Sequence, residues 1–425
     1  MRHLETNKVI SRIKGIFGKI FQKADGRCTI QTGDLVAALV CGLGTQDGRR
    51  KSISALRKSV MEFTKTKLSR GAFWERMASK RLLKHLYLLL NTLTAELCVQ
   101  LEVGSEIFTI LGVSKILLLD SSSFSLPDGA RGQFPAPRNN VVPAAVKLHM
   151  LYDLFGGATK WSDITPATTH DRKGFPPLDI LRRALIIFDL GYWDFQLLKD
   201  MIDRGVLFLS RVKSNARVEV IDVIKGASKS CIGFDLRSGR LDGFRGEIVE
   251  IIGQFIIPKT RQPFQSRIVG FWSPDDSSYH WYVTNLKVSS DLIYPLYRLR
   301  WQLELLWKGW KSFLHLDEIS SANTNIIMTI AVAGMCAGLI SGAVSISVLN
   351  GEPKEKQLAM SVQRSISFLI RIGKLLYQVL RTTERFARSN LSEMILLFKD
   401  DLHDPNYARR VNSLSRVHAG LVLTE

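Results

Sequence analysis

Hydrophobic and polar positions change their period along the chain, and these changes separate segments of different structure. Up to about residue 105 the apolar residues recur at helical spacing, and a leucine-rich stretch from 82 to 97 predicts a strongly apolar helix. From about residue 113 short apolar runs replace that spacing. They predict buried strands at Lys115–Leu119, Val146–Leu154, Ala184–Phe188 and Val206–Val212, with an amphipathic helix at about Asp194–Asp203. Strands that alternate with helices predict an α/β core.

The α/β pattern is interrupted by a stretch of a different kind. From about 214 to 285, alternating segments such as Glu247–Ile257 are separated by Gly, Pro, Asp and Ser, which predicts a β-rich insertion. After about 350 the chain becomes helical and basic again. We therefore expect five segments. These are a helical, basic region at 1–105, a first part of the core at 106–213, the insertion at 214–285, a second part of the core at 286–350, and a helical, basic C-terminal region at 351–425.

One segment is long enough to cross a membrane. Ile326–Leu349 carries no charged residue, but it is rich in Ala, Gly, Ser and Thr, and no second apolar run of that length accompanies it. We interpret it as a buried helix or helix pair rather than a membrane span. The N-terminus has no apolar stretch with a cleavage site, so secretion is not expected.

The charge of the chain indicates what kind of partner it binds. Its formal net charge is +19, and basic residues recur from Arg2 to Arg416 instead of forming one tail. A charge this large and this dispersed favours a polyanionic partner, since binding releases counterions. The five cysteines lie far apart with no CxxC spacing, which argues against a zinc module or a disulfide framework and fits a reducing cytoplasm.

The most informative polar pattern lies between residues 297 and 311. Tyr297, Arg300, Glu304 and Lys311 are spaced three, four and seven apart, which places them in one stripe of an α-helix. A carboxylate among groups that hold phosphate indicates metal-assisted chemistry on a nucleic-acid backbone. The alternative is a solvated, salt-bridged face in which Arg300 and Glu304 form an ordinary (i, i+4) pair.

Two aspartates stand at the ends of predicted strands. Asp120 follows the run at 115–119, and Asp189 follows the run at 184–188. Together with Glu304 they can converge on one point and hold two Mg²⁺ ions, which prefer oxygen ligands. Taken alone, each aspartate is a strand-end turn former. Asp128 and Asp194 are rival acids, although the place of Asp194 at a helix start favours an N-cap role.

These motifs resemble those of a known family. Tyr297-x2-Arg300-x3-Glu304-x6-Lys311 matches the YREK signature of the IS-four insertion-sequence transposases, a DDE family that includes the Tn-five and Tn-ten enzymes. Further segments resemble parts of the family core: Leu117–Asp120, Lys147–His149, Asp189-x-Gly191-Tyr192 and Thr284–Leu286. The resemblance extends from about residue 70 to about residue 350.

The resemblance implies an RNase H-like catalytic core with the β-rich insertion placed before the glutamate helix. It implies that Asp120, Asp189 and Glu304 bind two Mg²⁺ ions, for which Mn²⁺ can substitute. It also implies that the Tyr, Arg and Lys of the signature grip phosphates of the transposon end, and that the enzyme acts as a homodimer in a synaptic complex. Some family members cut through a DNA hairpin and hold a displaced base on an aromatic side chain of the insertion.

The candidates for that aromatic role are Trp281 and then Trp272; the alternative for both is packing within a strand. Arg211 and Lys213 are candidate contacts to the DNA backbone, with a solvated strand end as their alternative.

The leading functional prediction is a transposase that cuts and joins terminal inverted repeats in double-stranded DNA. It would work in the bacterial cytoplasm, at the nucleoid and without a membrane. The alternatives are a relative that only nicks DNA, an inactive DNA-binding regulator of transposition, and a membrane protein with its span at 326–349.

Overall fold

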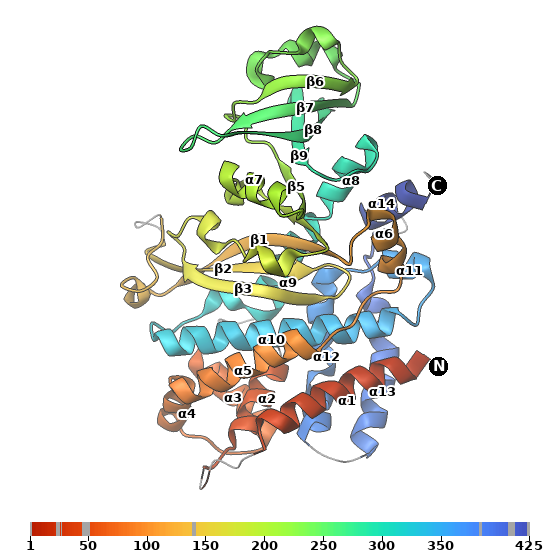
Figure 1. Cartoon of the computed structure of the whole chain (residues 1–425). Coiled ribbons are helices and arrows are strands. Elements are labelled where there is room, and N and C mark those ends of the chain that lie inside the picture. The colour runs from red at the N-terminus through yellow and green to blue at the C-terminus, as the bar shows by residue number, and fades with distance from the viewer. Residues whose placement is uncertain are drawn as a thin grey trace. The chain divides into compact units, whose positions relative to one another are not determined.

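The computed structural model describes residues 2–22, 26, 28–44, 52–137, 142–381, 385–406 and 413–422 (Figure 1). The chain divides into two compact units, each assembled from segments that are far apart in the sequence. The first unit comprises Met1–Gly104, Ser121–Thr169 and Gln302–Arg410, and the second comprises Ser105–Asp120, His170–Trp301 and Val411–Glu425.

The first unit is mostly helical. Its helices are α1 (Arg2–Ile20), α2 (Thr32–Gly42), α3 (Ile53–Thr64), α4 (Arg70–Met77), α5 (Lys80–Glu96), α9 (Trp301–Leu314), α10 (Thr324–Leu349), α11 (Lys354–Leu358), α12 (Val362–Arg381) and α13 (Arg385–Phe398). Serine N-caps start three of them. The hydroxyls of Ser52, Ser69 and Ser79 accept hydrogen bonds from backbone N–H groups in the first turns of α3, α4 and α5.

Helix α10 is the centre of the first unit. It packs against α1, α5 and α12, and Figure 1 shows it running beside α5. A helix that is apolar on all sides must be covered by other elements on all sides. The buried residues of α10 follow one another almost without a break from Ile326 to Leu349. Among the described residues, α10 alone is long and apolar enough to cross a membrane, and 89% of its most apolar window is buried inside the protein. It is a buried core helix in this structure.

A hairpin of two strands packs closely on α10. β2 (Ala144–Asp153) and β3 (Ala158–Pro166) pair antiparallel, and β3 contacts α10. The turn between them contains Gly157, which has a φ of +59°. At Gly342 of α10 an added Cβ would lie 1.8 Å from the Gly157 carbonyl oxygen. Glycine at these two positions lets the helix backbone touch the turn.

The second unit contains a mixed sheet. Its strands follow the order β1 (Lys115–Leu126, up to Asp120), β4 (Ala184–Phe188), β5 (Leu207–Arg211), β9 (Ser278–Thr284), β8 (Pro263–Ser273), β7 (Val249–Ile256) and β6 (Glu219–Lys225). β1, β4 and β5 pair in parallel, and the pairs from β5–β9 to β7–β6 are antiparallel. The helices of this unit are α6 (Val103–Leu111, from Ser105 on), α7 (Phe195–Asp203), α8 (Ile293–Arg298) and α14 (Ser413–Val422). The mixed α/β class predicted from the sequence is confirmed.

Side-chain hydrogen bonds join the parallel and antiparallel parts of this sheet. Asn285 accepts a bond from the Phe208 N–H at 3.0 Å and donates one to the Val206 carbonyl at 2.9 Å. Thr284 donates its hydroxyl hydrogen to the Phe208 carbonyl at 2.6 Å. The Thr284–Asn285 pair therefore fixes the end of β9 to β5.

The structure corrects two local predictions. The strand that carries Asp120 does not end there, because β1 continues to Leu126. The polar stripe from Tyr297 to Lys311 does not lie on one helix. α8 ends at Arg298, Leu299 and Arg300 form a turn, and α9 starts at Trp301. The turn is closed by (i, i+3) backbone bonds, among them one from the Arg300 N–H to the Tyr297 carbonyl at 3.0 Å.

Candidate active site

Two aspartates occupy matching positions on neighbouring parallel strands. β1 and β4 pair in register up to Leu119 with Phe188. Asp120 and Asp189 are the next residues on each side, and the Asp189 backbone remains extended, with φ −86° and ψ 167°. Neighbouring strands lie about 4.8 Å apart, and residues at one level point to one face. The second unit therefore brings these two acids side by side.

The segment at the end of α8 directs two polar side chains onto these aspartates. The Tyr297 hydroxyl donates to Asp189 Oδ1 at 3.4 Å. Arg300 Nη1 lies 3.6 Å from Asp120 Oδ2, and both side chains are largely buried, at 16% and 15% exposure. Two residues three apart thus place a phenol on one acid and a guanidinium on the other.

The electrostatics of this cluster keep the phenol protonated. Burial raises the pKa of Tyr297 to about 12, and the Asp189 charge acts in the same direction, whereas the Arg300 and Arg211 charges oppose it. A neutral phenol is a hydrogen-bond donor. At physiological pH Tyr297 can therefore donate to a carboxylate or to a phosphate oxygen.

Two further tyrosines support Tyr297, and the sequence analysis did not identify them. The Tyr282 ring on β9 lies 4.9 Å from the Tyr297 ring, and the Tyr294 ring of α8 lies 6.1 Å from that of Tyr282. Burial raises the pKa of Tyr282 strongly. The sequence held one signal for this contact, the helical spacing of three between Tyr294 and Tyr297.

The predicted DNA contacts Arg211 and Lys213 lie at the end of β5. The charge of Arg211 opposes the rise in pKa of both Tyr282 and Tyr297, which shows that its guanidinium is near this tyrosine cluster. Lys213 is half-buried two residues beyond the strand end. Arg211 therefore adds a positive charge near Tyr282 and Tyr297.

The two candidate tryptophans take part in packing within the sheet. The Trp281 ring covers Gly270 on β8, where an added Cβ would lie 2.3 Å from it, and stacks on Tyr279 with ring centres 4.9 Å apart. Trp272 meets the same tyrosine edge-on at 5.3 Å. Both side chains are half-buried. These contacts agree with the packing alternative for each tryptophan.

The remaining signature residues, Glu304 and Lys311, belong to the first unit. Glu304 is half-buried in the first turn of α9, where the helix dipole favours a negative charge. Lys311 is seven residues further along α9, and its Nζ lies 5.3 Å from the centre of the Phe124 ring. The structure thus brings Asp120, Asp189, Tyr297 and Arg300 together in one unit and places these two residues in the other.

The chemistry of the paired aspartates fits a divalent cation. Two adjacent carboxylates offer the oxygen ligands that Mg²⁺ prefers. Within the described part of the chain, no three His, Cys, Asp or Glu side chains are grouped closely enough to hold a metal ion. Of the rival acids, Asp194 is the N-cap of α7 and accepts a bond from the Leu197 N–H at 2.9 Å, as the sequence predicted. Asp128 is exposed and starts a 3₁₀ helix in the first unit.

Comparison with known proteins gives the class of this chain. The family model described as "Transposase DDE domain" matches residues 112–337, which is more than half of the sequence. The chain belongs to this family.

Among its relatives are transposases of insertion sequences. The IS1151 transposase of Clostridium perfringens is 24% identical over 54% of this chain and 57% of its own length. The IS231F transposase of Bacillus thuringiensis subsp. israelensis is 23% identical over 72% of this chain and 71% of its own length. The IS231E transposase of Bacillus thuringiensis subsp. finitimus is 22% identical over 88% and 86%. The predicted resemblance to insertion-sequence DDE transposases is confirmed.

One solved structure is also similar. A piggyBac transposase synaptic complex with hairpin DNA aligns over 91% of this chain and 82% of that chain, with a TM-score of 0.43 and 12% identity. At that level of similarity nothing about this chain is inferred from it.

Proposed function

We propose that this protein is a transposase that cuts and joins the terminal inverted repeats of an insertion sequence by phosphodiester hydrolysis and strand transfer. The observation that carries the proposal is the in-register pair Asp120 and Asp189, with Arg300 and Tyr297 directed onto it. The family match and the net charge of +19 support a DNA substrate. We infer that β1, β4 and β5 belong to an RNase H-like core, with strands β6–β9 as its insertion.

The carboxylates provide the catalytic ligands. In this proposal Asp120, Asp189 and Glu304 hold two Mg²⁺ ions, for which Mn²⁺ can substitute. Bound there, the metal supplies activation of the attacking hydroxyl and neutralisation of charge on the leaving oxygen. The protein contributes the in-register pairing of β1 and β4, which holds the two aspartates at one level of the sheet.

The signature cations and the phenol position the DNA strand. A guanidinium carries five N–H donors, so Arg300 can contact Asp120 and a phosphate oxygen at the same time. Tyr297 donates from a protonated hydroxyl, and Lys311 adds a positive charge on α9. Arg211 and Lys213 extend this basic surface along the end of β5. We propose that Trp281 also contacts DNA through the edge of its half-buried ring.

The proposal includes a setting and a partner. The substrate is double-stranded DNA, both as transposon end and as target, and the active species is a homodimer in a synaptic complex. The protein acts in the bacterial cytoplasm, at the nucleoid. The burial of α10 supports a role without a membrane.

The test is cleavage of a DNA fragment that carries the element's own ends, with and without Mg²⁺. We expect Glu304→Gln to abolish metal-dependent cutting while end binding stays within about twofold. Glu355→Gln, an exposed acid of α11, is the matched control and should cut like the wild type. Binding without cutting by the wild type would instead favour an inactive regulator, and nicking of one strand without joining would favour a nicking-only relative. If Glu304→Gln also lost DNA binding, its role would not be metal binding alone.

A further inference from the structure

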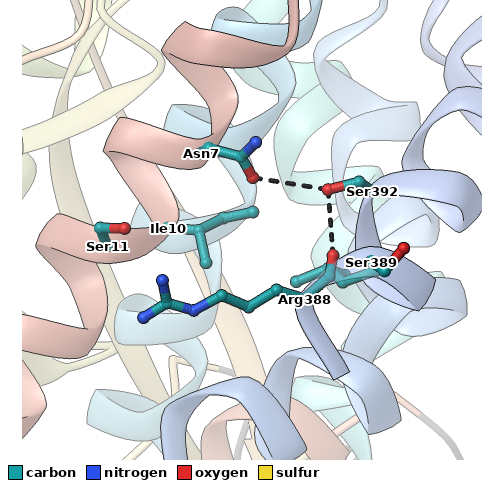
Figure 2. Close-up of a pocket in the computed structure, with 7 residues that line it drawn as sticks. Asn7, Ile10, Ser11, Arg388, Ser389 and Ser392 are labelled. Carbon is teal, nitrogen blue, oxygen red and sulfur yellow. Dashed lines mark hydrogen bonds between the residues drawn. The ribbon is translucent and has the colours of Figure 1, made fainter. Parts of the chain in front are cut away.

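A pocket outside the aspartate site lies between the first helix and α13, both in the first unit. It has a volume of about 450 Å³ and is lined by Asn7, Ile10, Ser11, Arg388, Ser389, Leu391 and Ser392. We call it the α1–α13 pocket. Figure 2 shows that its residues come from two facing helices, with the Arg388 side chain extended toward α1. Ile10 and Leu391 are buried and form an apolar floor, and the other lining residues are polar.

Two hydrogen bonds of Ser392 organise the rim of the pocket, one to α1 and one within α13. The Ser392 hydroxyl lies 3.4 Å from Asn7 Oδ1 and 3.0 Å from the Arg388 carbonyl oxygen (Figure 2). Ser11 and Ser389 are exposed beside it. The rim therefore presents the exposed hydroxyls of Ser11 on α1 and Ser389 on α13.

Among the described residues, Arg388 gives the pocket a positive charge. None of the described residues that line it is a carboxylate, and no described carboxylate forms an ion pair with the exposed Arg388 side chain. Lys14 lies one turn along α1 from Ser11. Burial is the larger cause that lowers the pKa of Lys14, and the Arg388 charge lowers it further. The two helices thus bring the like charges of Lys14 and Arg388 near each other.

A neighbouring pocket does not cancel this charge. It has a volume of about 140 Å³, shares Asn7 and Ser392, and includes Glu352. That carboxylate lies 2.7 Å from Lys399 Nζ and 3.4 Å from Lys356 Nζ, so two cations already compensate it. Glu352 therefore does not neutralise the α1–α13 pocket.

We propose that the α1–α13 pocket binds a phosphate-class oxyanion, with the Arg388 guanidinium as the charged ligand and the serine hydroxyls of the rim as further donors. Guanidinium groups bind such oxyanions through two parallel N–H···O bonds. A free phosphate ion and a phosphodiester of the DNA backbone present the same chemistry. We favour DNA as the source of the bound phosphate group, and this part of the proposal rests on the proposed function. The anion site itself does not.

Thermal unfolding with added inorganic phosphate tests the site without any DNA. Phosphate stabilises folded proteins in general by exclusion from their surface, so the measure of the site is the difference between variants. We expect phosphate, compared with chloride at equal ionic strength, to raise the midpoint of the wild type by roughly 2 °C more than that of Arg388→Ala, once its concentration exceeds the Kd about tenfold. Arg388→Lys should keep part of this extra rise. Lys58→Ala, which removes an exposed charge on α3 away from the pocket, should leave it unchanged.

Binding of a DNA duplex without transposon ends, measured at several salt concentrations, identifies the source of the phosphate. Loss of one contact to a DNA phosphate should reduce the steepness of log K for DNA binding against log salt concentration by about 0.9 in Arg388→Ala but not in Lys58→Ala. A phosphate effect without this change in slope supports the site and overturns the DNA source. If neither assay separates Arg388→Ala from Lys58→Ala, the proposal is wrong. Neither assay depends on cleavage, so the result is independent of whether the protein cuts its ends.

Discussion

Replacing Tyr297 with phenylalanine removes one hydroxyl and leaves the rest of the aspartate cluster in place. The ring contact with Tyr282 at 4.9 Å does not require the oxygen. What is lost is the bond to Asp189 at 3.4 Å, together with the hydrogen bond that joins Arg300 to the Tyr297 oxygen. Hydrogen bonds to charged groups contribute about 1.5–3 kcal/mol, but this one is longer than usual. We therefore assign about 1–1.5 kcal/mol to the loss of the Tyr297 hydroxyl, which corresponds to a cleavage rate reduced about five- to tenfold.

The assay is single-turnover cleavage of a labelled transposon end at saturating protein, from pH 7 to pH 10. Because the pKa of Tyr297 is raised to about 12, the phenol stays protonated throughout this range. The ratio of wild-type to Tyr297→Phe rates should therefore be constant with pH, and end binding should change less than about twofold. A ratio that increased with pH would show that the phenol ionises, and would refute the assignment of a protonated donor.

The same pKa predicts how stability depends on pH. The unfolded chain has an ordinary tyrosine pKa near 10, and burial raises that of the folded state to about 12. As pH rises, Tyr297 therefore loses its proton at a lower pH in the unfolded state than in the folded state. The stability that the protonated phenol contributes is intact below pH 10 and is lost as pH rises from 10 to 12. The loss is on the order of 2 kcal/mol. Between pH 8 and pH 11.5, the free energy of unfolding in urea should decrease less for Tyr297→Phe than for the wild type. Equal decreases would contradict the reasoning.

Three further substitutions test other parts of the structure. Glu304→Gln should abolish cleavage with binding intact, as measured on the same DNA ends; residual metal-dependent cutting would remove it from the ligand set. Arg300→Ala takes the cation away from Asp120 at 3.6 Å, and both DNA affinity and cleavage rate should fall; an unchanged affinity would exclude a phosphate contact. Gly342→Ala would place a Cβ 1.8 Å from the Gly157 carbonyl oxygen. Urea unfolding should show that the free energy of unfolding falls by about 3 kcal/mol or more. A free energy of unfolding equal to that of the wild type would show that α10 can move away from the turn.

Strands buried on both sides were the easiest elements to predict. The run Ala184–Phe188 coincides with β4, because all five of its residues are buried and both ends are marked by a change in polarity. Asp194 was identifiable as an N-cap because its role depends only on local backbone geometry. The extension of β1 beyond Asp120 was missed, since Ser121–Ser123 are polar and carry no apolar alternation.

The details of the aspartate cluster depend on tertiary contacts that periodicity does not reveal. The turn at Leu299–Arg300 contains no Gly or Pro, so neither of its residues indicates that the helix is interrupted. It occurs where Tyr297 and Arg300 each meet an aspartate. The contribution of Tyr282 was also hidden, because it comes from β9, more than 90 residues from Asp189 in the chain. A one-dimensional pattern contains neither the pairing of β9 with β5 nor the packing that follows from it.

The burial of α10 has a consequence for how the chain is made. During synthesis the N-terminal parts fold first, so α1 and α5 are available when α10 leaves the ribosome, but α12 is not. Until residue 381 has emerged, the face of α10 that α12 covers stays exposed to water or to any apolar surface nearby. Nascent chains that stop within α11 should therefore be retained by chaperones or aggregate, whereas chains that include α12 should be released in a soluble form.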